Sequence, residues 1–209
     1  MVATNNLQIP SSLRQMEFDG RLHSDAFEIS SVYLQQLRDL SILRLIHFQG
    51  LKKLPEDLGD LVNGLRELSL SYCRSVEELP GSISKIQSLR VISMEHCSSL
   101  RELPEDFGSL TSLQELNLQG CSNLKALPNS LEKLTALRLL NVSFCEGLLD
   151  LPHGSGNLTS LAQLDLKNCS QLRSIPESVG QMKSLDFKMD ERCGEDKNIT
   201  NCESNSNLI

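Results

Sequence analysis

One spacing constrains this chain more than any other feature, because three residue types follow a step of 24 residues. Leucines keep this step from Leu65 to Leu185, and six of the seven prolines stand in Leu-Pro or Ile-Pro pairs at matching positions, from Pro55 to Pro176. Self-similarity at a fixed period of this length indicates a solenoid of stacked turns. Six of the seven cysteines keep the same step: Cys73, Cys97, Cys121, Cys145, Cys169 and Cys193.

Each repeat unit predicts a short strand followed by a turn and a return segment. Leu116 and Leu118 alternate with Asn117, which is the period of a strand with one apolar face. Proline after Leu127 removes a backbone donor and starts an extended or 3₁₀-like return. One turn cannot cover its own leucines, so stacked turns must bury them together.

The pattern is similar to the leucine-rich repeat, whose period is about 20–29 residues. We therefore expect an α/β fold, a right-handed leucine-rich-repeat solenoid with a parallel inner sheet and short 3₁₀ or irregular convex segments. Aromatic residues make up only 4% of the chain, so the core should be aliphatic. About seven strands at ~4.8 Å spacing would form a shallow arc.

The two ends depart from the repeat. Residues 1–39 lack the Leu-Pro signature, and we expect an N-terminal cap or a degenerate repeat there. The array is predicted to cover residues 40–192, with its pattern decaying where Lys188 replaces the inner leucine after Leu185. Residues 193–209 are polar and acidic, which predicts a disordered tail.

The cysteine column allows three interpretations. Single cysteines 24 residues apart, without a C-x-x-C pair, do not resemble a zinc site. Neighbouring turns lie near the Cα separation that a disulfide tolerates, but the side chains should point inward in parallel. We favour the third interpretation, in which each thiol is small, buried and a weak donor to a turn carbonyl.

Composition and motifs disfavour several functions. A net charge of -7 argues against nucleic acid and against an anionic membrane surface. No apolar stretch approaches a membrane span, and Met1–Pro10 lacks the features of a secretory signal, so we expect a cytoplasmic protein. The chain has no P-loop and only scattered histidines. We expect no enzyme, no metal and no cofactor.

The inner face remains as the candidate binding surface, with a protein as the partner. Exposed aromatic residues in one row resemble interface anchors. The central column is predicted to be Arg44, Ser69, Ser93, Asn117, Asn141 and Asp165. The next column is Ile46, Ser71, Glu95, Gln119, Ser143 and Lys167. The column beside it is His47, Tyr72, His96, Gly120, Phe144 and Asn168. The residues selected as the candidate site are Arg44, His47, Tyr72, Glu95, His96, Gln119, Phe144, Asp165, Lys167 and Asn168.

The arrangement L-x-L-x-x-C-x-x-L-x-x-L-P resembles the repeat region of plant intracellular nucleotide-binding leucine-rich-repeat receptors, over roughly residues 40–193. This resemblance implies a role in disease resistance, in which the repeats recognise a pathogen effector or restrain the receptor's own domains. We expect a monomer or a part of a larger receptor. Nucleotide switching is not carried over, because this sequence contains no P-loop.

Two other hypotheses stay open. An intracellular signalling scaffold of the small-GTPase-linked type shares the Leu-Pro repeat but usually has Asn where this chain has Cys. An extracellular receptor ectodomain would require export, and glycan on Asn157 would support it.

Overall fold

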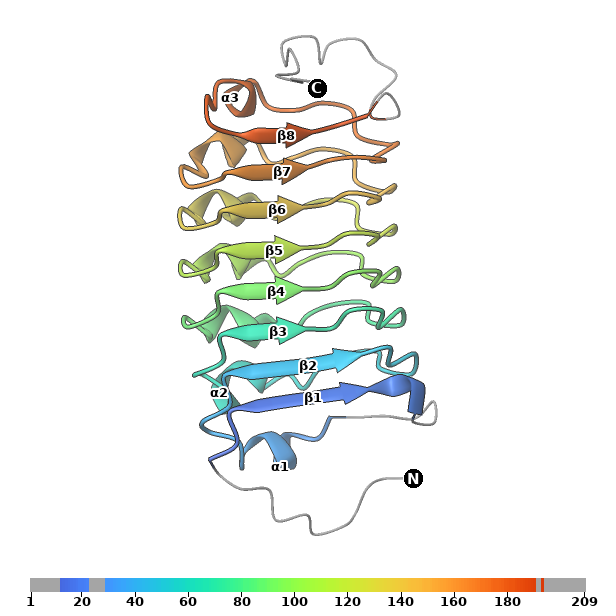
Figure 1. Ribbon diagram of the computed structural model, residues 1–209, viewed down its shortest axis with the longest axis vertical. Helices are drawn as coiled ribbons and strands as arrows, with labels where there is room; N and C mark the ends of the chain where they lie inside the picture. The colour runs from blue at the N-terminus through green and yellow to red at the C-terminus, as the bar shows by residue number, and fades with distance from the viewer. Residues whose placement is uncertain (1–11, 23–28, 191–192, 194–209) are drawn as a thin grey trace, which may run out of the picture.

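The computed structural model describes residues 12–22, 29–190 and 193. They form one parallel sheet whose strands are ordered as in the sequence (Figure 1). Eight strands are described rather than about seven, because the sheet includes residues near both ends. The strands are β1 (Gln15–Asp19), β2 (Ile42–Ile46), β3 (Glu67–Ser69), β4 (Val91–Ser93), β5 (Glu115–Asn117), β6 (Leu139–Asn141), β7 (Gln163–Asp165) and β8 (Asp186–Lys188).

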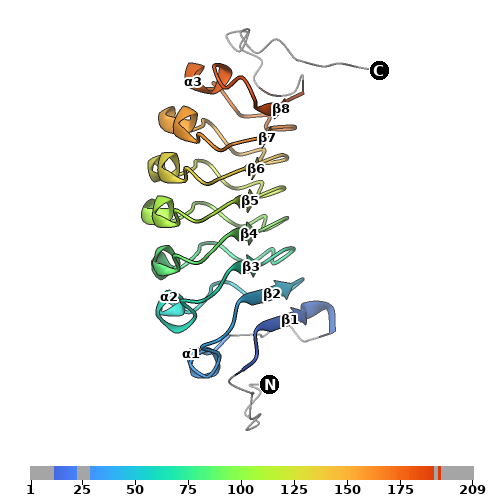
Figure 2. The same ribbon diagram turned by 60° about the vertical axis from the view of Figure 1, so that its left-hand side comes forward.

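Short helical segments line the side opposite the sheet, and the stack bends gently so that the sheet is on the concave side (Figure 2). Most follow a Leu-Pro or Ile-Pro pair directly: Pro128 has φ -65° and ψ 146° just before η4. This confirms the predicted extended and 3₁₀-like return. The segments on this side are α1 (Ser31–Leu34), α2 (Leu58–Leu61), η2 (Gly81–Lys85), η3 (Glu105–Ser109), η4 (Asn129–Lys133), η5 (His153–Asn157) and α3 (Glu177–Gly180). One more, η1 (Gly20–Leu22), directly follows β1 at the edge of the sheet.

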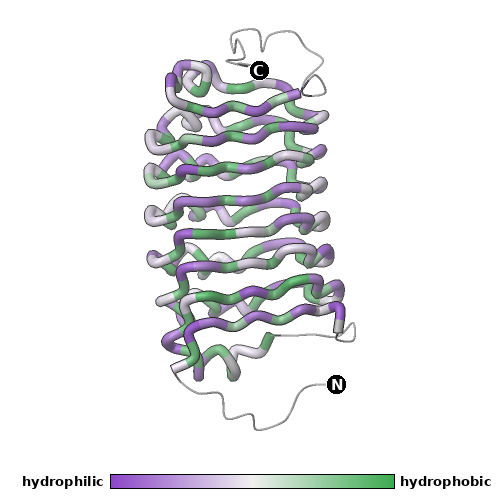
Figure 3. The backbone as a smooth tube through the Cα atoms, viewed as in Figure 1, coloured by the Kyte–Doolittle hydropathy of each residue, from purple (hydrophilic) through white to green (hydrophobic). Residues whose placement is uncertain are grey.

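The core is a continuous column of aliphatic side chains between the sheet and the helical segments. Hydropathy alternates along the strands in Figure 3, as expected for strands with one buried face. Leu116 pairs with Ile92 on one side and Leu140 on the other, and Leu116 is fully buried. Each turn is therefore stabilised mainly by its two neighbours.

Truncating one of these leucines tests the stacked core. We expect Leu116→Ala to reduce the free energy of unfolding by about 2–5 kcal/mol, because the cavity would lie between two other turns. Urea unfolding followed by circular dichroism measures the change. Glu115→Ala, at an exposed position on the same strand, is the matched control. Equal unfolding midpoints for the two variants would contradict this account of the core.

The cysteine column has the predicted structural role. The six cysteines of the repeat are free and buried. Each thiol donates a hydrogen bond to a backbone carbonyl of the preceding turn, over 2.8–3.2 Å between sulfur and oxygen. Burial raises the pKa of the Cys73 thiol to about 11 and that of Cys145 to about 12. The thiols from Cys73 to Cys145 are therefore neutral links between turns.

The last strand corrects the expected alignment. Phe187, and not Lys188, pairs with Leu164 of the preceding strand, while Lys188 pairs with Asp165. The chain is one residue shorter between Leu185 and this strand, so a step of 24 residues places Lys188 wrongly. The cysteine step is nevertheless kept, because Cys193 is buried and donates to the Leu166 carbonyl over 2.8 Å. Residues 191–192 and 194–209, where most of the predicted tail falls, lie outside the described residues.

The N-terminal region contributes an additional turn. Gln15–Asp19 pairs with Ile42–Ile46, which places Met16 beside Leu43 and Phe18 beside Leu45. Leu34 and Leu37 are buried in the core that the array shares. These residues continue the sheet and the core at the start of the array.

Candidate functional site

The pairing of the strands places the predicted central column as expected. Arg44, Ser69, Ser93, Asn117, Asn141 and Asp165 are successive partners across the sheet. The structure adds Glu17 and Lys188 at the two ends of this column. It also shows a further column on the same face that sequence analysis missed: Ile42, Glu67, Val91, Glu115, Leu139 and Gln163. The alternation around Leu116 could have revealed it, since Glu115 and Asn117 share a face.

Three serines in the predicted solvent-facing columns are buried. Ser69, Ser71 and Ser143 are exposed by only 7%, 8% and 4%. The Ser71 hydroxyl lies 3.1 Å from those of Ser69 and Ser93, and Ser143 donates to the Asn141 side chain over 2.7 Å. These small hydroxyl side chains form hydrogen bonds with neighbouring side chains and lie beneath larger residues of the concave face.

Polar side chains of the central column are engaged within the protein. Arg44 Nε donates to Glu67 over 2.6 Å, and its NH1 lies 3.2 Å from Glu17. The Asn117 amide donates to Glu95 over 2.6 Å, while its oxygen accepts the backbone N–H of Gln119 over 3.1 Å. These polar groups already have hydrogen-bond or ion-pair partners within the protein. They form a floor of polar groups that are bonded to one another rather than a set of free side chains.

The column beside the strand ends has an uncommon backbone. His47, Tyr72, His96, Phe144 and Asn168 all have φ between 56° and 63°, and Gly120 has φ 72°. A side chain other than Gly or Asn costs about 1–2 kcal/mol in this left-handed region. The turn imposes the conformation, because the backbone N–H of each residue up to Phe144 donates to a carbonyl of the next turn. We call His47, Tyr72, His96 and Phe144 the ring column.

Its rings form an ordered surface. Tyr72 stacks on His47 and on His96, with ring centroids 4.8 Å apart in both pairs. Gly120 then leaves room for the His96 ring, whose Nδ1 would be only 2.5 Å from a Cβ at Gly120. Beyond it, Phe144 is 44% exposed, and it is one of two large exposed hydrophobic residues in the described chain. The rings therefore run along one edge of the sheet and end in an exposed phenyl group.

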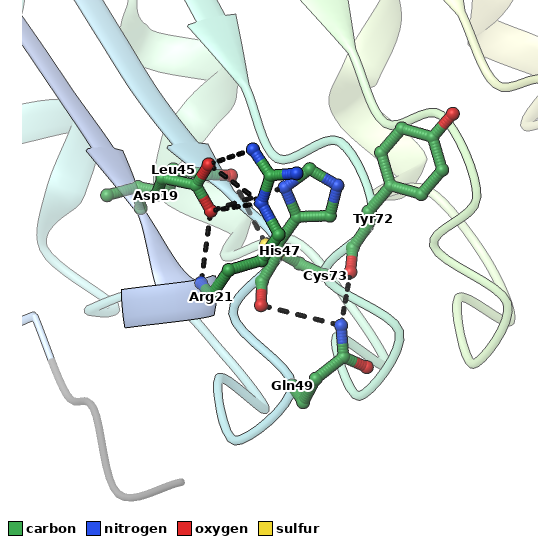
Figure 4. A network of polar contacts seen from close by, with 7 residues as sticks. All are labelled: Asp19, Arg21, Leu45, His47, Gln49, Tyr72 and Cys73. Atoms are coloured by element: carbon green, nitrogen blue, oxygen red, sulfur yellow. Dashed lines mark hydrogen bonds and ion pairs between the residues drawn. The ribbon is translucent and has the colours of Figure 1, made fainter. Parts of the chain in front are cut away.

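The N-terminal end of the ring column is held by polar contacts (Figure 4). The Gln49 amide donates to the backbone carbonyls of Tyr72, over 3.1 Å, and of His47, over 3.4 Å. His47 Nδ1 lies 3.4 Å from an Asp19 carboxylate oxygen. Hydrogen bonds from Arg21 hold the pKa of Asp19 well below its usual range, so this carboxylate stays charged beside His47. These contacts pre-organise the first two rings.

The ten candidate residues share the concave face but do not gather in one cluster. Phe144 and Lys167 are exposed, and the others are partly exposed. Asp165 accepts the backbone N–H of Lys167 over 3.0 Å, and Gln119 accepts from the Asn141 amide over 3.3 Å. From β2 to β7 the residues extend over about 24 Å at the usual strand spacing. This geometry suits an extended or broad partner better than a small molecule.

Two other observations bear on chemistry. Across residues 12–22, 29–190 and 193, no group of three or more His, Cys, Asp or Glu side chains is placed to hold a metal ion. No helix in that part of the chain is long and apolar enough to cross a membrane.

A family model for the leucine-rich repeat region matches residues 11–150 and 85–204. The chain belongs to the leucine-rich-repeat family. This assignment confirms the expected leucine-rich-repeat solenoid, and with it a general scaffold for protein interaction whose curved stack offers an extended binding surface. No match was found among curated protein sequences.

Solved structures agree on the fold. The leucine-rich repeat domain of the type III effector XopL is 25% identical, with a TM-score of 0.62 over 88% of this chain and 70% of that one. A chain in the Drosophila Toll–Spatzle complex is 21% identical, with a TM-score of 0.65 over 86% of this chain. This leucine-rich-repeat chain spans only 24% of that second protein.

Proposed function

We propose that this leucine-rich-repeat array is a protein-recognition module of the plant disease-resistance type, which binds a pathogen effector or the receptor's own domains on its concave face. The observation that carries the proposal is the ring column. Gly120 and Asn168 meet the requirement for positive φ at little cost, whereas His47, Tyr72, His96 and Phe144 do not. Side chains that cost folding energy while exposing rings suggest selection for contact with a partner.

The remaining features of the face support a protein partner. The polar floor beneath the rings is compensated internally, so a partner loses little by covering it. Tyr72 and Phe144 present aromatic surface, which is enriched at protein interfaces. Lys167 is an exposed charge on the turn next to Phe144. The proposal includes a cytoplasmic location, where the free thiols of the cysteine column would stay reduced.

The test is a double substitution in the ring column. The wild-type array is screened against pathogen effectors that are produced one at a time, and each binder is measured again with Tyr72→Ala plus Phe144→Asp. We expect binding to be abolished while the melting temperature changes little, because both side chains lie outside the core. Val32→Asp, on α1 and at the other large exposed hydrophobic residue of the described chain, is the matched control and should bind as wild type does.

Unchanged binding by the double variant would contradict a concave site. If no effector binds but an intracellular signalling protein binds at the ring column, the scaffold hypothesis replaces the disease-resistance one.

A further inference from the structure

A row of arginines runs along the opposite edge of the sheet, where the strands begin. The backbone hydrogen bonds define it, because Ser41 donates to the Arg14 carbonyl, Arg90 to that of Arg66, and Arg138 to that of Gln114. Residues at these positions are therefore stacked turn upon turn. The eight-turn series contains Arg14, Ser41, Arg66, Arg90, Gln114, Arg138, Ala162 and Leu185. We call Arg14, Arg66, Arg90 and Arg138 the arginine row.

The arginine row forms no ion pair within the part of the chain that is described. All four side chains are exposed, and none forms an ion pair or a side-chain hydrogen bond with a described residue. Some exposed cations elsewhere are paired: Lys85 lies 2.9 Å from Asp60, and Arg101 lies 3.1 Å from Glu77. A protein with a net charge of -7 thus keeps a line of uncompensated positive charge at one edge.

We propose that the arginine row is a second interaction surface, which binds an acidic, extended segment of a partner polypeptide. Guanidinium groups pair with carboxylates through two parallel hydrogen bonds. From Arg14 to Arg138 the row crosses five strand intervals, or about 24 Å. A segment of about seven extended residues has the same length.

Charge favours a short acidic peptide over a nucleic acid. A long polyanion would extend past the row and meet the acidic remainder of the molecule. Glu67, Glu115 and Asp186 lie on the neighbouring column of the sheet. These carboxylates repel an anion, so favourable contact is confined to the edge of the sheet. The ligand must therefore be a short, extended chain.

The arginine row and the ring column are separate surfaces. The rings follow the carboxyl ends of the strands, and the arginines precede the amino ends. These two ends lie at opposite edges of the sheet in Figure 1. Occupation of one edge leaves the other accessible. The second surface consequently does not depend on the concave-face proposal.

Fluorescence polarisation with a labelled octaglutamate peptide tests the inference. We expect the wild-type array to bind this peptide at low ionic strength, and to bind it more weakly as salt screens the charges. Arg66→Glu plus Arg90→Glu should weaken binding at least about tenfold, because two attractive contacts become repulsive. Tyr72→Ala plus Phe144→Asp should bind the peptide as wild type does.

The matched control is Arg74→Glu plus Arg173→Glu, which makes the same change in net charge at exposed positions outside the row. Binding that falls equally in both double variants would overturn the inference, because net charge alone would then explain it. Tighter binding of a short oligouridine than of octaglutamate would overturn it in favour of nucleic acid. So would self-association of the wild type that the Arg66→Glu plus Arg90→Glu variant loses.

Discussion

Raising the pH from 8 to 10 is expected to unfold the array, because the buried thiols of Cys73, Cys97, Cys121 and Cys145 stay protonated while the unfolded chain does not. Burial raises the pKa of the thiols from an ordinary value of 9.0, to about 11 for Cys73 and about 12 for Cys145. Burial also raises the pKa of Cys97 and Cys121. These raised values mean that the contribution to stability is complete below pH 9 and is lost as the pH rises through the folded-state values.

The expected loss is large because several thiols act together. At one pH unit above its ordinary pKa, each protonated buried thiol costs about 1.4 kcal/mol, so four reduce the free energy of unfolding by about 6 kcal/mol. That amount is comparable to the whole stability of many domains. Urea unfolding at a series of pH values measures it through the slope of stability against pH.

A variant with fewer thiols separates this effect from other alkaline titrations. Cys97→Ala plus Cys121→Ala removes two buried donors and should lower the stability at pH 8, since the Leu70 and Met94 carbonyls each lose one of two hydrogen-bond donors. The slope above pH 9 should then be shallower by about two protons. A slope that is the same in both proteins would show that the thiols do not control alkaline unfolding.

Gly108→Ala is expected to be a strongly destabilising substitution on the convex side. A Cβ at Gly108 would lie 1.8 Å from the backbone oxygen of Ser130 in the next turn. The two turns are joined there, since the Gly108 N–H donates to the Ser130 hydroxyl over 3.0 Å, and that hydroxyl donates to the Glu105 carbonyl. The backbones must separate, which we expect to cost about 3 kcal/mol or more.

Thermal unfolding of Gly108→Ala beside Gly81→Ala provides the comparison. A Cβ at Gly81 meets no atom within 4 Å, so this substitution should be neutral or slightly stabilising. Adding Ser130→Ala to Gly108→Ala should give no rescue, because the obstructing oxygen belongs to the main chain. Full rescue by Ser130→Ala would mean that the side chain, and not the backbone contact, sets the cost.

Features that repeat with the 24-residue step could be predicted from the sequence. The buried leucines, the inward thiols and the central column from Arg44 to Asp165 all follow from period and alternation, and the structure confirms them. These positions are set by the stacking of identical turns, so knowledge of one turn places its equivalents.

Features that depend on the three-dimensional approach of turns could not be predicted in this way. Residue type does not reveal positive φ at Tyr72 or Phe144, because such residues seldom adopt it. The contact of Gly108 with the Ser130 backbone joins two turns at a distance that no pattern states. The segment from Leu185 to Phe187 is one residue shorter than its equivalents. The sequence does not reveal this, because the 24-residue cysteine step continues past it to Cys193. The choice of the ten site residues stays a prediction.

The left-handed position at the end of each strand has an evolutionary consequence. Its backbone is fixed by the turn above, while its side chain takes no part in the buried interior, so glycine, asparagine, histidine, tyrosine and phenylalanine all occur there in one molecule. A single codon change at such a position alters the exposed surface and leaves the buried leucines and thiols unchanged. Duplication of a turn would add one more such position. A family built this way can diversify its binding specificity one residue at a time.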